Sequence, residues 1–446
     1  MNKAVRFKLF LMMVLELFIW GAWYPLVFGY LPSLGFTPGQ QTWILNGFPV
    51  AAIVGMFFSN QFADRNFAAE RFLAVSHIIG GAAILALAWT KSFLPFCVLM
   101  WVHCLLYVPT LSIVNSVAFA HMKDAQKEFG IVRMGGTIGW ILAAWPFTFI
   151  LVDWGAVKAA NPQGFVNWLG TVLSSGLTGP ALQAGTKWTF ILAGVASFVL
   201  AIFSLTLPHT PPKRVEEGAG SKLAWLEAMK LLVLPFILIL WVVTFVDATV
   251  HNLFFNWTGR FLGTAVDQGG VGIPGNWIMP VMSIGQVAEI LTMLILGVTL
   301  KNLGWKMTMI IGILGHAARF AVFAFMPQHQ GIIILVNVLH GICYAFFFAT
   351  VYIFVDEFFP KDARASAQGL FNLMIFGLGP LAANFVGPKL IGSESFVRNG
   401  VIDFKGLFLI PCVAAIAAAI VLALFFRPPA RKEAAVAPGG APAPAH

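Results

Sequence analysis

Long apolar runs alternate with short polar or Pro/Gly-rich breaks along almost the whole chain. A helix needs about 20 mostly apolar residues to cross the hydrocarbon core, and backbone that faces lipid must satisfy its own hydrogen bonds. The runs therefore predict an all-α membrane protein with twelve transmembrane helices, not the short alternating segments of a β-barrel. The predicted spans are 8–30, 43–63, 71–90, 93–120, 134–152, 189–208, 228–255, 277–300, 306–326, 331–355, 366–388 and 404–426.

Composition agrees with a chain that lies in the lipid bilayer. The 446 residues are 59% hydrophobic and only 10% charged, and the mean hydropathy is +0.85. The net charge of +9 does not indicate nucleic-acid binding, because the basic residues punctuate the apolar runs instead of clustering on one polar surface. The four cysteines fall inside predicted helices without metal-ligand spacing, so no metal or other cofactor is expected.

Charges between the spans predict the orientation of the chain. An even number of spans places both termini on one side of the membrane. Most of the lysines and arginines fall in segments on that side, and the positive-inside rule assigns it to the cytoplasm. We therefore expect a multi-pass protein of the bacterial inner membrane with both termini cytoplasmic.

A polar segment, "LPHTPPKRVEEGAGSK" (207–222), divides the spans into two sets of six. The predicted organisation is an N-terminal half (1–208), a cytoplasmic linker (209–227), a C-terminal half (228–427) and a disordered tail (428–446). This layout resembles that of the major facilitator superfamily, whose pseudo-symmetric halves hold substrate near the middle of the membrane. "FADRNFAAERF" and "LKNLGWKM", after the second and eighth spans, loosely resemble the short signature loop of that superfamily.

Few ionisable residues lie deep within the predicted spans. Charged side chains are costly in hydrocarbon, so they usually face a bundle interior or a water-filled cavity and mark a substrate or ion pathway. The acids are Glu16, Asp247 and Glu289, and the bases are Arg133 and Arg319. By position, Glu16 and Glu289 are the deepest.

The fifth span carries one polar and aromatic stripe. Arg133, Thr137 and Trp140 stand at i, i+4 and i+7, so a guanidinium, a hydroxyl and an indole share one helix face. Taken singly, these residues have simpler explanations. Arg133 can anchor the end of the preceding loop at the membrane interface, and Thr137 and Trp140 can be ordinary packing residues.

The seventh and eighth spans carry similar stripes. Gln286 and Glu289 stand at i and i+3, while Asp247 and His251 stand at i and i+4 with Asn252 adjacent. Interhelical packing is the alternative explanation for the polar pair of the eighth span. Together with the fifth span, these groups offer bidentate hydrogen bonding, amide donors and acceptors, and an aromatic face. That set suits a neutral polar molecule with a flat ring and hydroxyl groups.

Segments through nearly the whole chain resemble the bacterial nucleoside:proton symporters, a family within the major facilitator superfamily. They are "LFIWGAW" (17–23), "YVPTLSIVNSV" (107–117), "RMGGTIGWI" (133–141), "LTLPHTPP" (205–212), "SIGQVAEI" (283–290), "RFAVFAF" (319–325) and "ARASAQGLF" (363–371). The resemblance implies uptake of nucleosides by alternating access, together with protons that move down their gradient. We expect the protein to be a monomer. The substrate-binding residues that the resemblance implies are Arg133, Thr137, Trp140, Asn252, Gln286 and Glu289.

The chain departs from the family pattern at several of the positions that concern substrate and proton. Thr249, which we include as a substrate-binding candidate, stands where relatives carry glutamine. His340 and Ala345 stand where a tyrosine and an acid are expected in the tenth span, and Glu16 replaces a glutamine. The loop 153–188 is also longer than the family's.

Proton coupling requires a group whose protonation changes the preference for substrate or for one conformation. Glu289 is the first candidate because it lies beside the predicted substrate site, and Glu16 and Asp247 are the others. A proton-coupled symporter of a sugar or other polyol remains an alternative, as does an uncoupled nucleoside facilitator. A non-transporting sensor on the same fold is a further one. An enzyme is not expected, because no nucleophile, metal or cofactor motif occurs in an ordered position.

Overall fold

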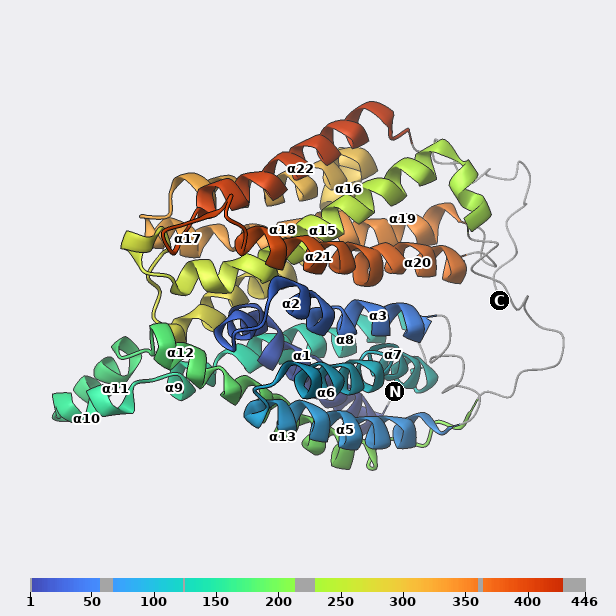
Figure 1. The fold of residues 1–446 in the computed structure, drawn as a ribbon. Helices are drawn as coiled ribbons and strands as arrows, with labels where there is room; N and C mark the ends of the chain where they lie inside the picture. Colours follow the sequence, from blue (N-terminus) through green and yellow to red (C-terminus); the bar gives the residue numbers. More distant parts are fainter. Residues whose placement is uncertain (1, 57–66, 123–124, 213–228, 360–363, 428–446) are drawn as a thin grey trace, which may run out of the picture.

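The computed structural model describes residues 2–56, 67–122, 125–212, 229–359 and 364–427, and these residues are mainly helical (Figure 1). The helices of the N-terminal half are α1 (Lys3–Ser33), α2 (Pro38–Leu45), α3 (Gly47–Val54), α5 (Ala69–Ala86), η2 (Leu87–Trp89), α6 (Phe93–Tyr107), α7 (Thr110–Ala120), α8 (Ala125–Ala144), α9 (Phe147–Ile150) and α13 (Lys187–Ser204). Three short helices, α10 (Trp154–Ala160), α11 (Phe165–Ser174) and α12 (Gly179–Gly185), lie between α9 and α13.

The C-terminal half follows the same all-helical plan. Its elements are η3 (Leu231–Val233), α15 (Pro235–Gly263), η4 (Val266–Gln268), α16 (Gly275–Phe325), α17 (Gln330–Val336), α18 (Leu339–Cys343), η5 (Tyr344–Ala349), α19 (Thr350–Phe358), α20 (Arg364–Asn372), η6 (Leu373–Leu378), α21 (Gly379–Ile391) and α22 (Phe404–Phe425). A two-stranded antiparallel hairpin, β1 (Val397–Arg398) and β2 (Val401–Ile402), precedes α22, with Val397 opposite Ile402. η5 and η6 are π-helical.

The helices agree closely with the predicted spans. Among the described residues, nine helices are long and apolar enough to cross a membrane, and they cover ten of the twelve predicted spans. α16 consists of two helices that meet at Gly304, where φ is 71° and the backbone leaves helical geometry, and each of the two corresponds to one predicted span. Of the remaining two spans, 43–63 falls on α2 with α3 and lies outside the described residues from 57 onward, and 134–152 falls on α8 with α9. Most of the predicted linker, and the whole of the predicted tail, lie outside the described residues.

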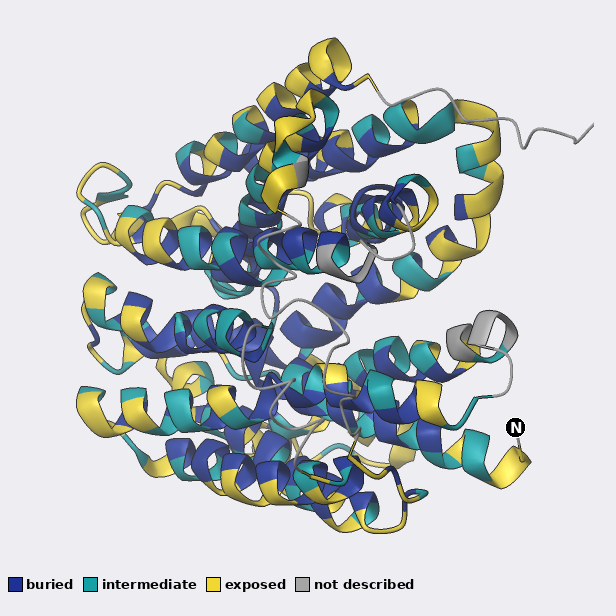
Figure 2. Cartoon of the chain, turned by 90° about the vertical axis from the view of Figure 1, so that its right-hand side faces the viewer, coloured by how far each residue is buried: buried dark blue, intermediate teal, exposed yellow. Residues whose placement is uncertain are grey.

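The two halves are separate bundles that lie side by side. In Figure 1 the helices from α1 to α13 form the lower bundle and those from α15 to α22 form the upper one. Figure 2 shows buried residues between the helices and exposed ones on their outer faces. Many of the exposed residues are apolar, such as Leu294 at 75% and Ile202 at 70% exposure. Helices that are apolar on their outer faces as well as inside are suited to a lipid surround.

Small residues allow the first and fifth spans to pack closely. A side chain at Gly139 of α8 would collide with the carbonyl oxygen of Val14 in α1, and one at Gly135 with that of Phe10. Close backbone approach through glycine is typical of helix contacts in membranes. This contact holds α8, which carries the polar stripe of the fifth span, against α1.

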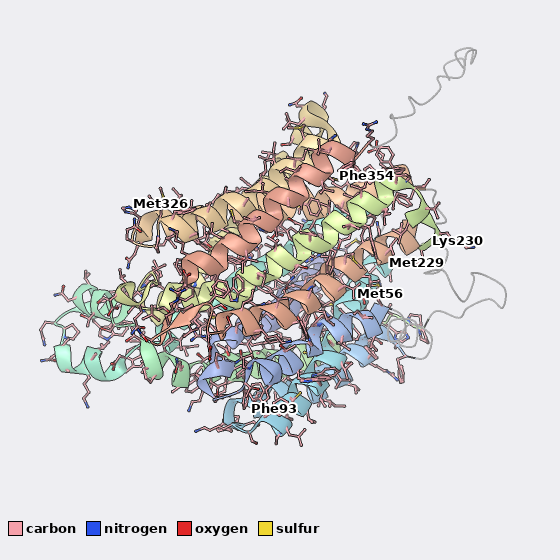
Figure 3. All side chains as sticks on the ribbon, turned by 45° about the horizontal axis from the view of Figure 1, so that its top comes forward. Met56, Phe93, Met229, Lys230, Met326 and Phe354 are labelled. Atoms are coloured by element: carbon pink, nitrogen blue, oxygen red, sulfur yellow. The ribbon has the colours of Figure 1, made fainter. Side chains whose placement is uncertain are left out.

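The two ends of the bundle differ. Met56 and Lys230 lie at one end and Met326 at the other (Figure 3); we call the end at Met326 the distal end. There α10 and α11 project beyond the bundle (Figure 1), so the predicted long loop 153–188 is largely helical. Asp153 caps α10 by accepting a hydrogen bond from the amide of Ala156 at 2.9 Å.

Hydrogen bonds tie the halves together toward the distal end. The hydroxyl of Thr42 in α2 donates to the carbonyl oxygen of Asn384 in α21 at 3.0 Å, and the Asn384 amide donates to that of Leu45 at 3.1 Å. Trp277, at the start of α16, donates its indole hydrogen to the Leu173 carbonyl at the end of α11, at 2.8 Å. The α10–α12 segment is therefore part of the contact between the halves.

Candidate substrate cavity

A cavity of about 140 Å³ lies where the two halves meet. Its lining comes from both halves and is mostly aromatic, with a small number of polar side chains, which is the usual character of a small-molecule site. The lining residues are Leu17, Trp20, Tyr24, Phe48, Arg133, Gly136, Thr137, Trp140, His251, Asn252, Phe255, Gln286, Glu289, His340, Tyr344, Phe348, Ile375, Phe376 and Pro380.

Six of the seven predicted substrate-binding residues line this cavity: Arg133, Thr137, Trp140, Asn252, Gln286 and Glu289. They come from α8, α15 and α16, the helices that correspond to the fifth, seventh and eighth spans. The helical spacing brings them together because each stripe faces the boundary between the halves. Placement in one cavity is consistent with a shared role.

The polar groups of the cavity present both donors and acceptors. The Gln286 side chain is 7% exposed, and among the described residues its Oε1 atom has no hydrogen-bond partner. Buried polar atoms are nearly always paired, so this acceptor is available to a bound molecule. Arg133 supplies only donors and Glu289, when ionised, only acceptors.

Asn252 has a fixed orientation. Its Oδ1 atom accepts a hydrogen bond from the hydroxyl of Tyr24 at 3.1 Å, and its Nδ2 atom donates to the carbonyl of Ala248 at 2.8 Å. Tyr24 belongs to α1 and Asn252 to α15, so this hydrogen bond crosses between the halves inside the cavity wall. A ligand that competes for Asn252 would act on a contact between the halves.

Aromatic rings form one side of the cavity. The Trp20 ring stacks on Phe48 with centroids 4.5 Å apart and meets Trp140 edge-to-face at 5.1 Å. Phe255 contacts Tyr24 at 5.4 Å and Trp140 at 6.1 Å. Offset and edge-to-face packing of this kind gives a rigid surface on which a flat ring can stack.

A larger pit of about 820 Å³ lies between α1, α12 and α15. Thr178, Arg260 and Gln268 are among the residues that line it, and it shares Phe255 with the central cavity. The Phe255 ring therefore stands between the two spaces. α12, which belongs to the long loop 153–188, forms part of the wall of this pit.

The seventh predicted substrate-binding residue, Thr249, is not among the described residues that line the cavity. Its hydroxyl donates to the carbonyl of Phe245, one turn earlier in α15, at 2.8 Å. Such back-bonding to the helix is common for threonine. The structure therefore does not bring Thr249 together with the other candidates.

The residues of the tenth span that line the cavity differ from those that the family pattern led us to expect. His340, Tyr344 and Phe348 line the cavity at i, i+4 and i+8, while Ala345 is fully buried and packs with Phe346. Tyr344 is adjacent to the position where an acid was expected. Sequence reasoning missed Tyr344 and the aromatic residues of α1, although "FIWGAWY" already shows aromatic side chains three and four residues apart.

Glu16 lies away from the cavity in the N-terminal half and is fully buried. Its Oε2 atom lies 3.0 Å from His77 Nε2, and its Oε1 atom accepts a hydrogen bond from the Thr110 hydroxyl at 2.6 Å. The Tyr107 hydroxyl donates to the Glu16 backbone carbonyl at 2.6 Å. Glu16 therefore joins α1 to α5, α6 and α7.

Asp247 is also fully buried and is not among the described residues of the cavity wall. It faces His316 Nε2 at 3.7 Å, and neither of its oxygens has a hydrogen-bond partner among the described residues. Among these residues, no three His, Cys, Asp or Glu side chains are arranged to hold a metal ion.

Two helical bundles with a polar and aromatic cavity between them define a membrane transporter of the major facilitator type. The sequence profile of the nucleoside H⁺ symporter family matches residues 1–180 and 163–431. The chain belongs to this family. The two matched segments overlap at 163–180, in the region of α11 and α12.

Known relatives and solved structures agree with this assignment. The chain is 28% identical to the YegT protein of Escherichia coli strain K12, over 94% of this chain and 93% of that one. It is 25% identical to the nucleoside permease NupG of the same strain, over 92% of each chain. The crystal structure of NupG superposes with a TM-score of 0.76 at 22% identity, over 96% of this chain and all of that one. A D-xylose-proton symporter shares the fold with a TM-score of 0.66 at 15% identity.

Proposed function

We propose that the central cavity is the site where this nucleoside H⁺ symporter binds the nucleoside that it carries. The observation that supports the proposal most is the convergence of polar side chains from α8, α15 and α16 on a cavity with an aromatic wall. A nucleoside has a flat base and a ribose with hydroxyl groups. The base can stack on the aromatic side, and the hydroxyls and base edge can bond to the polar side.

Each polar residue has a distinct part in the proposal. Arg133 and Gln286 hydrogen-bond the nucleoside directly, with Gln286 Oε1 as the free acceptor. Asn252 couples substrate binding to the contact between the halves, because a nucleoside that bonds Asn252 competes with the Tyr24 hydroxyl. Glu289 accepts the coupling proton, because it lies in the cavity wall beside these groups. Proton and substrate then act on the same conformational equilibrium.

The proposal places the protein in the inner membrane as a monomer, with both termini in the cytoplasm. The distal end, with its pit and the α10–α12 segment, then faces the periplasm. Substrate and proton enter from that side, the halves rock about the cavity, and both leave on the cytoplasmic side.

A sugar symporter on the same fold is the competing proposal, because a D-xylose-proton symporter shares the architecture. The aromatic wall around Trp20, Trp140 and Phe255 favours a ligand with a flat ring over a sugar alone. Membership of the nucleoside H⁺ symporter family favours the same choice.

The test is uptake of radiolabelled uridine and adenosine by cells that lack their own nucleoside carriers, with and without a protonophore. We expect accumulation that the protonophore abolishes and that excess unlabelled nucleoside inhibits, while free ribose has little effect. Inhibition by free sugars with no nucleoside accumulation would support the sugar alternative. Nucleoside uptake that is the same with and without the protonophore would indicate an uncoupled facilitator.

A Glu289→Gln variant tests the coupling role separately. We expect it to exchange nucleoside across the membrane while accumulation against a gradient falls at least tenfold, because glutamine is close in shape but cannot take up a proton. Thr249→Val is the matched control, since this residue lies outside the cavity wall and bonds only its own helix among the described contacts. Full proton-driven accumulation by Glu289→Gln would contradict the assignment.

A further inference from the structure

A second group of buried ionisable side chains lies behind the cavity wall in the C-terminal half. Asp247 comes from α15, His316 and Arg319 from α16, and His340 from α18. The first three are fully buried and His340 is 2% exposed. We call these four residues the Asp247–Arg319 cluster. His340 also lines the substrate cavity, so the cluster and the cavity share one side chain.

Arg319 determines which nitrogens of the two histidines carry hydrogen. Its Nη1 atom lies 2.8 Å from His340 Nδ1, and its Nη2 atom lies 3.1 Å from His316 Nδ1. A guanidinium can only donate hydrogen bonds, so both Nδ1 atoms must be acceptors. The hydrogen-bond network therefore assigns both rings as neutral, with their hydrogen on Nε2.

The assigned tautomer directs a hydrogen of His316 at Asp247. His316 Nε2 lies 3.7 Å from Asp247 Oδ2, which is too long for a hydrogen bond. Among the described residues, His316 Nε2 and both Asp247 oxygens have no hydrogen-bond partner. A buried carboxylate without donors is costly, whereas a carboxylic acid in the same place is much less so. Asp247 is therefore arranged to accept a proton.

Glu289 and Arg133, which line the cavity together with His340, are the ionisable groups on the cavity side of the cluster; the other polar groups around it carry no full charge. The His251 ring of α15 lies 5.5 Å from the His316 ring and 4.8 Å from the His340 ring. Cys343 in α18 is fully buried and lies within electrostatic range of Arg319 and Asp247, and Tyr344 in η5 lies 6.4 Å from His251.

On its remaining sides the cluster meets an aromatic ring and α22. Arg319 lies 3.9 Å above the Phe254 ring, and in α22 the Cys412 thiol donates to the Ala317 carbonyl. Asp247 and Arg319 are thus the opposite-charge pair of the cluster itself, with a neutral imidazole between them.

We propose that Asp247, His316 and Arg319 form a proton-binding site separate from Glu289, and that His340 links this site to the substrate cavity. The step is a proton transfer only: a water-borne proton adds to a carboxylate oxygen of Asp247 and later returns to water, with no change of oxidation state. The coupling to cargo rests on the proposed nucleoside site, whereas the proton site itself does not.

The link to the cavity follows from the shared hydrogen bonds. When Asp247 is neutral, Arg319 is the one full charge of the cluster, and its remaining acceptors are the two imidazoles. A change in how Arg319 holds His340 moves a side chain of the cavity wall. By thermodynamic linkage, a nucleoside that contacts His340 must in turn change the proton affinity of the site.

Infrared titration of the reconstituted full-length protein, without nucleoside, tests the site directly. We expect a buried carboxylic acid C=O band that appears as pH falls, and that shifts when the native protein is made with ¹³C-labelled aspartate. Asp247→Asn should lose this band, and His316→Gln should move its midpoint. His103→Gln is the matched control, because His103 is equally buried but lies in the N-terminal half against the Gly80 carbonyl.

The labelled native protein keeps the test valid if a variant does not fold. Absence of any aspartate-shifted C=O band across the accessible pH range would overturn the proposal, as would retention of every titrating band in folded Asp247→Asn protein. An equal shift in His103→Gln and His316→Gln would also overturn it, since the effect would then be general.

The link to transport is tested by the number of protons moved per uridine, measured from reversal potentials in proteoliposomes. We expect Asp247→Asn to move one proton fewer per uridine than the native protein, and His103→Gln to match the native protein. An unchanged ratio in Asp247→Asn would overturn the coupling through His340. If native protein shows the aspartate band but carries no uridine or adenosine, the proton site stands and the proposed cargo fails.

Discussion

Each half of the transporter holds a fully buried carboxylate against an equally buried histidine, and the two pairs are built differently. In the N-terminal half, Glu16 lies 3.0 Å from His77 and accepts a second hydrogen bond from Thr110 at 2.6 Å. In the C-terminal half, Asp247 lies 3.7 Å from His316 and has no hydrogen-bond partner among the described residues. Both acids are fully buried.

Burial alone therefore does not decide whether an intramembrane acid is a structural residue or one that changes its protonation state. A carboxylate with its lone pairs satisfied acts as a cross-link, because losing a partner leaves a costly orphan group. One without donors is poised to change its protonation state. Glu16, the deeper acid by sequence position, therefore has the features of a structural residue, and we assign the coupling roles to Glu289 and Asp247.

Among the substitutions that test the difference between the two acids, removal of Arg319 should lower the stability of the protein most. Arg319→Met removes both imidazole hydrogen bonds and leaves the two buried Nδ1 atoms without a donor. A hydrogen bond to a charged group is worth about 1.5–3 kcal/mol, so the loss of two should cost about 3 kcal/mol or more. We expect the free energy of unfolding, measured by denaturant titration in detergent, to fall by that amount.

Arg260→Met is the control for Arg319→Met, because Arg260 lines the distal pit and is partly exposed. Its cost should lie within about 0.5 kcal/mol, as for most substitutions away from buried networks. Equal costs for the two variants would show that Arg319, in the Asp247–Arg319 cluster, contributes no more to stability than Arg260 does in the wall of the pit.

A matched pair of amide substitutions comes next in size. Glu16→Gln removes the charge of the acceptor, so each of its two side-chain contacts, with His77 and Thr110, should weaken by about 1 kcal/mol, the difference between hydrogen bonds to charged and to neutral groups. Asp247→Asn breaks no hydrogen bond that the described residues make. We expect thermal unfolding to show a clear loss of stability for the first and a much smaller one for the second. A larger loss of stability for Asp247→Asn than for Glu16→Gln would contradict the view that Glu16 is the structural acid of the two.

Much of the fold was predictable because the membrane restricts what a sequence can do. Apolar runs of sufficient length must be helices in lipid, and ten of the twelve predicted spans fall on long apolar helices of the described chain. The short helices α10, α11 and α12 were not predicted, because "DWGAVKAANPQGFVNWLG" mixes glycine, proline and aromatic residues without a long period. Their contact with Trp277 joins residues more than 100 positions apart, which local pattern cannot reveal.

The cavity was predictable where helical spacing alone sets the face, as for Arg133, Thr137 and Trp140. It was not predictable where a local alternative competes, and Thr249 is the example: its hydroxyl bonds the preceding turn of its own helix. The roles of Glu16 and Asp247 depend on partners 61 and 69 residues away, His77 and His316. Nothing in the spacing around either acid distinguishes a satisfied carboxylate from an unsatisfied one.

Thr110→Val has the smallest predicted effect on stability, and it tests what distinguishes the Glu16–His77 pair from the Asp247–His316 pair. Thr110→Val removes one donor from Glu16 and keeps the shape of the side chain, so Glu16 comes to resemble Asp247 in having a histidine as its one side-chain partner. Hydrogen bonds between membrane helices contribute about 0.6 kcal/mol on average and about 1.7 at most, so unfolding should become easier by roughly 1 kcal/mol. If satisfaction by donors is what keeps Glu16 structural, the same variant should gain a titrating carboxylic acid band in the infrared titration. A stable Thr110→Val protein with no new band would mean that His77 alone suffices, and that the 3.7 Å gap at Asp247, more than the number of donors, distinguishes the two sites.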